Sequence, residues 1–290
     1  MDYDFSYERK HDWAVCIDSD GSLMDSMELK HKECFCPATV NVWNLQPVSK
    51  AFREEWDFVN LYSRYRGCNR FQALVYAVDF LFEREDVRKT GLEKPDLTDL
   101  KEWMRTAPEV SSSAIHALAT EDPGCSPCLK TVAEWSDEID FLIRRIARNV
   151  RPFAYVREAI ATLGENADII VVSAATQKSL LRDLGECGID RMTASIMGQE
   201  AGTKAQSIAR ILSLGYGKDH VLKIGDAPGD LKAARDNGVL FYPIVAGEET
   251  ESWKELEEKY ACMFLSGEYK GKVMDGRVEY FLSKLPEKHF

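Results

Sequence analysis

The feature that most constrains the fold is an alternation of short apolar runs with amphipathic segments over residues 153–245. The runs ADIIVVSAAT, ASIMG, HVLKIGD and VLFYPIVAG are short, apolar and bounded by turn residues, which is typical of buried parallel strands. The segments between them carry apolar residues at helical spacing, and one of them closes at Gly188. Because parallel strands need crossover connections, this alternation predicts a parallel sheet with helices on both faces.

The region before residue 150 has a different character. Residues 13–18 predict one more buried strand, but from about 28 to 150 apolar and aromatic residues recur at helical spacing, for example at Phe52, Trp56 and Val59. The segment 96–107 predicts a helix capped by Asp96 or Thr98, and 131–150 predicts another. We therefore expect an α/β core of residues 1–28 and 149–290, with a Rossmann-like parallel sheet, and an inserted all-helical domain of residues 29–148.

Composition and charge narrow the class of protein. The hydrophobic share of 45%, the charged share of 29% and the net charge of −11 are ordinary for a globular chain, and no dense Lys/Arg tract is present. This argues against nucleic-acid and membrane-surface partners. The N-terminal residues lack the apolar core of a secretory signal, and no run approaches the roughly 18–20 apolar residues of a membrane span. We expect a cytoplasmic protein whose anionic ligand, if any, meets local Lys, Arg or a metal.

The eight cysteines allow two interpretations. The pairs Cys34/Cys36 and Cys125/Cys128 together would supply four thiolates for a zinc site. Only the second pair has a zinc-knuckle spacing, however, and no histidine lies close to it in sequence. Reduced, buried thiols in a cytoplasmic protein are therefore the favoured interpretation.

Polar side chains gather where the predicted strands end. Asp18, Asp20 and Asp25 follow the first strand within eight positions, Ser173 closes the second, and Asp226 follows a later one. In open parallel sheets, ligands bind beyond the carboxyl ends of the strands. Carboxylates that meet there repel one another, so they require solvent, a bound cation or a shared proton.

Four of these segments resemble, in order, the motifs of the haloacid dehalogenase-like superfamily: DSDGSLMD at 18–25, Ser173 closing IIVVS, Lys204 in AGTKAQS, and IGDAPGD at 224–230. The resemblance covers roughly residues 1–28 and 150–245. RPFAYVREAI and the turn after Gly188 also resemble the phosphoglycolate phosphatase and β-phosphoglucomutase branch, which carries a helical cap between its first two motifs. An EF-hand loop fits less well, because its glycine belongs at the sixth position and Gly21 is at the fourth.

The resemblance implies a set of catalytic roles. Asp18 would be the nucleophile that forms an aspartyl-phosphate, and Asp20 the general acid and base. Lys204 would neutralise developing charge and orient Asp18, while Ser173 with Ala174 would bind the phosphate oxygens. Because Asp20 is present, the chain resembles the phosphate-handling members rather than the dehalogenases.

The same resemblance implies a Mg²⁺ site. Asp18 and Asp226 would each supply a carboxylate oxygen and Asp20 its backbone carbonyl, with Asp230 in a supporting position one helical turn later. Each residue also has a simpler interpretation: Ser173 as a strand-end hydroxyl, Lys204 as a solvated lysine and Asp230 as an acid in the first turn of a helix.

Two positions depart from the family pattern. Ser22 stands where threonine is usual, and it keeps the hydroxyl. Lys223 lies inside a predicted central strand where an apolar residue is usual, so it needs either an exposed end or a partner.

The helical segment YSRYRGCNR (62–70) supplies candidate substrate contacts. A guanidinium group of Arg66 or Arg70, with Arg64 nearby, would suit a carboxylate, a second phosphate or a sugar hydroxyl. The alternative is a solvated basic face beside Glu54 and Glu55.

Three functions remain open from the sequence. The leading hypothesis is a Mg²⁺-dependent phosphatase that hydrolyses a small phosphorylated metabolite through an aspartyl-phosphate, as a monomer or homodimer. A phosphomutase of the β-phosphoglucomutase type would use the same residues. A non-catalytic binding protein on the same fold is the third, and the intact Asp20 argues against it.

Overall fold

The computed structural model describes residues 7–289, which form two compact units. The sheet unit takes in the described residues up to Met27 together with Asn149–Pro286. The helical unit takes in Glu28–Arg148 and the described residues from Glu287 onward. Among residues 7–289, no helix has both the length and the apolar character needed to cross a bilayer.

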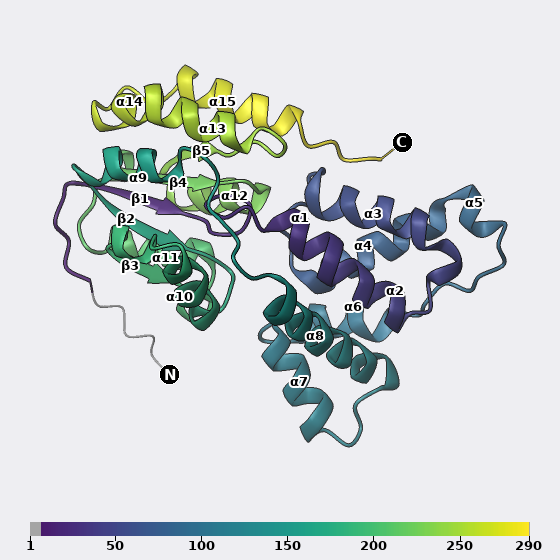
Figure 1. The fold of residues 1–290 in the computed structure, drawn as a ribbon. Coiled ribbons are helices and arrows are strands. Elements are labelled where there is room, and N and C mark those ends of the chain that lie inside the picture. Colours follow the sequence, from purple (N-terminus) through teal and green to yellow (C-terminus); the bar gives the residue numbers. More distant parts are fainter. Residues whose placement is uncertain (1–6, 290) are drawn as a thin grey trace. The chain divides into compact units, whose positions relative to one another are not determined.

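The sheet unit is built on five parallel strands in the order β3-β2-β1-β4-β5 (Figure 1). Their bounds are β1 Trp13–Ile17, β2 Ala167–Val172, β3 Ser195–Met197, β4 Val221–Gly225 and β5 Leu240–Pro243. The parallel α/β class predicted from the alternation is confirmed. The chain runs outward from β1 to β3 and then returns to β4 beside β1, so the strand order reverses there, which is where such sheets bind ligands.

Helices cover both faces of the sheet. The four that follow strands or lead into them are α9 Val156–Gly164, α10 Gln177–Glu186, α11 Lys204–Leu212 and α12 Pro228–Asn237. The C-terminal ones are α13 Glu249–Glu255, a π-helical turn Leu256–Tyr260, α14 Ala261–Leu265 and α15 Lys272–Ser283. Val15 and Ile17 pack with α9, α10, α13 and α14, whereas Ala14 and Cys16 pack with α11, α12 and α15. This alternation along β1 is the expected consequence of strand geometry.

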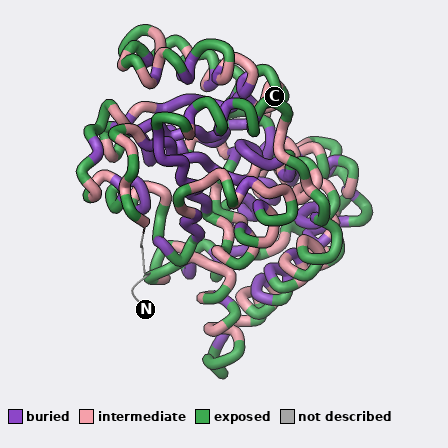
Figure 2. Tube along the Cα trace, turned by 60° about the vertical axis from the view of Figure 1, so that its left-hand side comes forward, coloured by how far each residue is buried: buried purple, intermediate pink, exposed green. Residues whose placement is uncertain are grey.

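The described part of residues 28–148 contains helices and no strand, as predicted. These are α1 Met27–Lys30, a π-helical turn His31–Phe35, α2 Cys36–Val42, α3 Ser49–Leu61, α4 Arg70–Glu83, α5 Glu85–Arg88, α6 Thr98–Thr106, α7 Ser112–Glu121 and α8 Pro127–Ile146. Large side chains, among them Phe52, Trp56, Phe71 and Trp135, form its core. Figure 2 shows the buried stretches of the chain as purple segments.

Local signals explain where some of these helices begin. The apolar periodicity after Phe52 is interrupted at 62–69, where Gly67 adopts a φ of 72° and the Asn69 side chain accepts the Phe71 N–H. The chain therefore forms α3 and α4 with a turn between them. The cap predicted at Asp96 or Thr98 is wrong, because α6 begins at Thr98 and Leu97 is its N-cap, without a side-chain cap bond. Asp96, one residue earlier, accepts the Thr98 N–H at 2.9 Å.

The chain also contains short 3₁₀ turns at Gln46–Val48, Asp190–Met192, Gln199–Ala201 and Lys218–His220.

Near the C-terminus, His289 belongs to the helical unit. Its ring stacks on Phe58 at 4.6 Å between centroids, and its Nδ1 lies 3.1 Å from Glu55 Oε2.

Candidate active site

The register of the sheet brings the predicted strand-end residues to one edge. Ile17 pairs with Val171 of β2 and with Ile224 of β4, so the residues that follow these three strands emerge together. The Asp18 N–H donates to the Ile224 carbonyl at 3.0 Å, which extends the β1–β4 ladder by one residue. Asp18 therefore begins a loop at the point where the strand order reverses.

A tight loop follows Asp18. Gly21 has a φ of 75°, and its N–H donates to the Met24 carbonyl at 3.0 Å. The Leu23 N–H turns back to the Asp18 carbonyl at 3.3 Å. Within this loop the Asp20 carboxylate accepts a hydrogen bond from the Ser26 hydroxyl. A glycine suits this loop, because its backbone conformation is strained for other residues.

Three carboxylates converge beside this loop. One oxygen from each of Asp18, Asp226 and Asp230 lies within 4.8 Å of the others. All three residues are buried, with Asp230 fully enclosed. Like charges at this separation in a poorly solvated site repel strongly. The cluster therefore requires positive charge.

Part of that charge comes from two lysines. Lys204 Nζ lies 2.9 Å from Asp18 Oδ2 and 2.8 Å from Asp230 Oδ1. Lys223 Nζ also lies 2.8 Å from Asp230 Oδ1 and donates to the Ile224 carbonyl at 3.0 Å. The partner that the sequence required for a lysine inside a central strand is thus Asp230. Three carboxylates and two ammonium groups leave the cluster with one net negative charge.

The start of α11 presents Lys204 to the cluster. Thr203 and Gln206 form a capping box, in which the Thr203 hydroxyl accepts the Gln206 N–H at 3.2 Å and the Gln206 side chain accepts the Thr203 N–H at 2.8 Å. Lys204 is the first residue of the helix, and its ammonium group is engaged by two aspartates. This excludes the simpler interpretation of a solvated lysine.

The cluster perturbs the titration of its members. Burial raises the pKa of Asp18 to about 6, although Lys204 opposes that rise and Asp230 adds to it. Burial also acts to raise the pKa of Asp230, but attraction by Lys204 and Lys223 outweighs it and lowers the pKa. For Lys204, burial lowers the pKa, whereas Asp18 and Asp230 raise it more.

The donor set fits a divalent cation. Asp230 Oδ2 is buried and has no hydrogen-bond partner among the described residues, while Oδ1 takes both lysines. Carboxylate oxygens are the ligands that hard cations such as Mg²⁺ prefer. The three aspartates are therefore consistent with a divalent metal site.

Close packing of α12 on β4 brings Asp230 into the cluster. A Cβ atom at Gly225 would lie 2.3 Å from the Asp230 Cβ, so only glycine permits this approach. Pro228 occupies the first position of α12, where its missing N–H is harmless. Asp230 follows in the first turn and points inward rather than into solvent.

Two hydrogen bonds in series connect the C-terminal helices to the cluster. The Ser22 hydroxyl donates to Asp226 Oδ1 at 2.7 Å, and the buried Trp253 of α13 donates its indole N–H to the Ser22 carbonyl at 2.8 Å. The hydroxyl of Ser22 was predicted from the sequence, but the C-terminal helices and a role for Trp253 were not. No local motif marks Trp253, because its partner lies 231 positions earlier.

Ser173 lies at the end of β2 and is buried. Its hydroxyl oxygen accepts the Ala175 N–H at 3.2 Å, and its own N–H donates to the Met197 carbonyl at 3.0 Å. These contacts are those of a strand-end hydroxyl. Ala174 is exposed. Phosphate binding by Ser173 and Ala174 stays a prediction.

The arginines of the segment 62–70 are engaged within the helical unit. Arg64 pairs with Glu287, and the buried Arg66 donates to the Leu61 carbonyl at 2.7 Å. Arg70 lies 2.8 Å from Asp140 Oδ1, with its guanidinium above the Phe35 ring. The substrate contacts expected of Arg66 and Arg70 stay predictions. Glu54 and Glu55 pair with Arg84.

All eight cysteines are free thiols. Within residues 7–289, the group of side chains arranged to hold a metal is the aspartate cluster, and no cysteine belongs to it. The four-thiolate zinc alternative therefore finds no support in the described residues.

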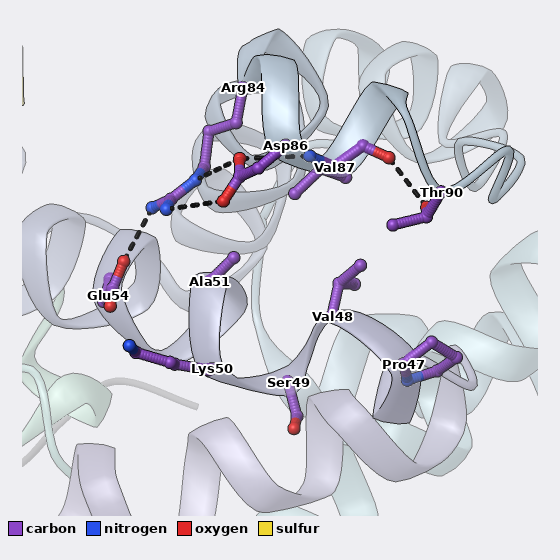
Figure 3. Close-up of a pocket in the computed structure, with 10 residues that line it drawn as sticks. All are labelled: Pro47, Val48, Ser49, Lys50, Ala51, Glu54, Arg84, Asp86, Val87 and Thr90. Carbon is purple, nitrogen blue, oxygen red and sulfur yellow. Dashed lines mark hydrogen bonds and ion pairs between the residues drawn. The ribbon is translucent and has the colours of Figure 1, made fainter.

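The helical unit has a hollow of its own, of about 300 Å³. Figure 3 shows its lining, in which Arg84 bonds to Glu54 at 2.8 Å and to Asp86 at 3.1 Å. Arg84, Glu54 and Asp86 thus bind one another within this hollow, which Lys50 also lines. The candidate chemistry lies with the aspartate cluster instead.

Comparison with known proteins gives one sequence match. The sequence model of the family described as haloacid dehalogenase-like hydrolase matches residues 125–244. No curated protein matches the chain significantly.

Several solved structures are similar. A predicted phosphoglycolate phosphatase from Haemophilus somnus is 16% identical, with a TM-score of 0.48 over 79% of this chain and 84% of the other. A hydrolase of that superfamily, subfamily IA, from Geobacter sulfurreducens is also 16% identical, with a TM-score of 0.39 over 82% and 90%. CbbY from Rhodobacter sphaeroides, in complex with phosphate, is 10% identical, with a TM-score of 0.41 over 79% and 85%.

Proposed function

We propose, from the premise that the chain belongs to the haloacid dehalogenase-like hydrolase superfamily, that it is a Mg²⁺-dependent phosphatase of small phosphorylated metabolites. The observation that carries the proposal is the buried cluster of Asp18, Asp226 and Asp230, which two lysines leave one positive charge short of neutrality. A purely structural cluster gains nothing from that deficit. A divalent cation bound to the three carboxylates would offset it.

Asp18 is the nucleophile in this proposal. Its oxygen forms a bond to phosphorus while the bond from phosphorus to the substrate's ester oxygen breaks, which leaves an aspartyl-phosphate. Lys204, 2.9 Å from Asp18 Oδ2, orients the carboxylate and stabilises negative charge that develops on the phosphoryl oxygens. The reaction requires the ionised carboxylate, which predominates above the pKa of about 6.

Asp20 transfers the protons. In the first step its carboxyl group donates a proton to the departing alkoxide, which leaves as an alcohol. In the second step its carboxylate takes a proton from a water molecule that attacks the aspartyl-phosphate, and phosphate and ionised Asp18 are released. The Ser26 hydroxyl, bonded to Asp20 Oδ1, would hold this side chain in place between the two steps.

Asp18, Asp226 and Asp230 would hold Mg²⁺, with the Asp20 carbonyl as a further ligand expected from the family. The cation supplies charge neutralisation that lets a carboxylate approach a phosphate dianion. Ser22 holds Asp226 in the required position through its hydrogen bond to Oδ1.

The test is phosphate release from a panel of sugar phosphates, phosphoglycolate and nucleoside monophosphates, with Mg²⁺ and with EDTA. We expect turnover of at least one substrate that EDTA abolishes, and loss of that turnover in Asp18→Asn. The matched control is Asp219→Asn, an exposed acid of the sheet unit, which should leave turnover unchanged.

Four results would overturn the proposed phosphatase. Metal-independent turnover, or full activity in Asp18→Asn, would reject the mechanism. A long-lived aspartyl-phosphate together with isomerised product would identify a phosphomutase, and ligand binding without turnover across the panel would identify a binding protein.

A further inference from the structure

Lys223 is the least expected residue of the site. It lies in β4 between Leu222 and Ile224, and none of its surface is exposed. Burying an ammonium group carries a large desolvation cost that one ion pair often fails to repay. A methionine would fill the same strand position without that cost. Stability of the sheet therefore does not explain the lysine.

The Lys223 ammonium shares one oxygen of Asp230 with Lys204, each at 2.8 Å. It bonds Asp230 Oδ1, and Asp230 Oδ2 is the buried oxygen without a partner among the described residues. One oxygen of Asp230 is thus occupied by the two lysines, and the other is left for a further ligand. Lys223 would act on such a ligand through its charge and through Asp230.

The charge of Lys223 makes the net charge of the cation-bound cluster positive rather than zero. Three aspartates with Lys204 alone would carry a net charge of −2, which a divalent cation brings to zero. With Lys223 the cluster carries −1, and a divalent cation brings it to +1. This difference in net charge affects a phosphate dianion that binds after the cation, because the dianion then meets a positive centre instead of a neutral one.

We propose that Lys223 is a specificity-determining residue that acts through Asp230, favouring a dianionic phosphoryl group at the expense of cation affinity. The inference rests on the proposed function, and it concerns the charge of the phosphoryl group that the site binds best. Monoanionic phosphodiesters gain half as much from the added charge. Lys223 thus weakens the binding of the cation and strengthens the binding of the substrate.

The test measures two binding constants in Lys223→Met, which keeps an unbranched side chain one atom shorter and removes its charge. Calorimetry with Mg²⁺ alone should show binding that is tighter by roughly tenfold or more, because a buried repulsion is removed. Calorimetry with inorganic phosphate at saturating Mg²⁺ should show binding that is weaker by roughly tenfold or more. The control is Lys232→Met, an exposed lysine of α12 that pairs with Asp236, and it should change neither constant.

Opposite shifts distinguish this role from a structural one. A lysine that only supports the fold would, when replaced, weaken both constants or neither, and either result overturns the inference. If Lys223→Met does not fold, Lys223→Gln keeps a donor toward Asp230 and removes the charge. It should show the same opposite shifts in the two binding constants, and their absence overturns the inference.

The wild-type protein separates this inference from the proposed function. If wild type binds neither Mg²⁺ nor phosphate, the proposed phosphatase fails. If it binds both and Lys223→Met shows no opposite shifts, the phosphatase stands and only the role of Lys223 fails.

Discussion

The two ends of the sheet both bury carboxylates, but they satisfy them differently. At the amino end, Asp168 of β2 accepts the backbone N–H groups of Lys10 and His11 at 3.0 and 3.1 Å, and the hydroxyl of Tyr216. At the carboxyl end, Asp18 and its two neighbouring aspartates meet one another and share two lysines. Asp168 has more donors than oxygens, whereas Asp230 Oδ2 has none among the described residues.

The pKa values of the two sites move in opposite directions. Burial acts to raise the pKa of Asp168, but hydrogen bonds from Tyr216 and from the backbone of Lys10 and His11 outweigh it and lower the pKa. Burial raises the pKa of Asp18 to about 6, and its neighbouring carboxylates add to that. Burial of an acid is therefore not a mark of function. A buried carboxylate oxygen without a hydrogen-bond donor, such as Asp230 Oδ2 among the described residues, is the more informative sign.

The largest expected difference is in turnover. Asp226→Asn should reduce kcat/KM for the best substrate of the phosphate-release panel by roughly a thousandfold, because it removes a charge on which the cation and the phosphoryl group depend. Asp168→Asn should leave the folded enzyme's kcat/KM within about twofold of wild type. Equal losses in the two variants would show that the two ends of the sheet are not functionally distinct.

Replacing Asp168 should affect the stability of the protein much more than its turnover. Asp168→Asn replaces an acceptor by an amide that presents an N–H to several donors, so the free energy of unfolding at pH 7 should fall by about 3 kcal/mol. Chemical denaturation measures it. The exposed Asp219→Asn should change stability by less than about 0.5 kcal/mol. A loss that small in Asp168→Asn would contradict the structural role of the amino-end contacts.

A smaller effect should appear in the pH dependence of the metal-free protein. Because the pKa of Asp18 is raised to about 6, the folded state binds more protons than the unfolded state between about pH 4 and 6, so stability falls as pH rises through that window. Asp18→Asn removes this penalty. At pH 7.5 it should be more stable than wild type by about 2 kcal/mol, with the gain gone below about pH 4.

Urea denaturation at several pH values measures this difference. Asp168, whose pKa is lowered, contributes stability above its unfolded pKa that is lost as pH falls, so Asp168→Asn should show its largest deficit at neutral pH. A gain in Asp18→Asn that is constant from pH 4 to 8 would contradict the assigned cause.

The smallest effect is thermal stabilisation by the cation. Mg²⁺ at ten times its dissociation constant should stabilise wild type by about 1.4 kcal/mol, seen as a rise in Tm. Asp168→Asn should show the same rise, since its site lies at the other end of the sheet, and Asp226→Asn should show none. A rise retained in Asp226→Asn would place the cation elsewhere.

Much of the sheet unit was predictable because its signals are local. Each strand is a continuous buried run closed by a turn residue, so Asp18, Ser173 and Asp226 could be placed at strand ends from their immediate neighbours. The C-terminal helices were not predicted. Trp253, for example, packs into the same core as Val15, and that contact joins residues far apart in the chain.

The alternation of buried runs and amphipathic segments determined, without any structure, a parallel sheet with acids at its carboxyl edge, because hydrophobic periodicity is written along the chain. Only the tertiary structure decided how charge is shared there: Asp230 faces inward because Gly225 lets α12 approach β4, and it binds both Lys204 and Lys223. Ion pairing depends on distances between atoms whose positions in the sequence are unrelated, and burial then sets how strongly each pair acts.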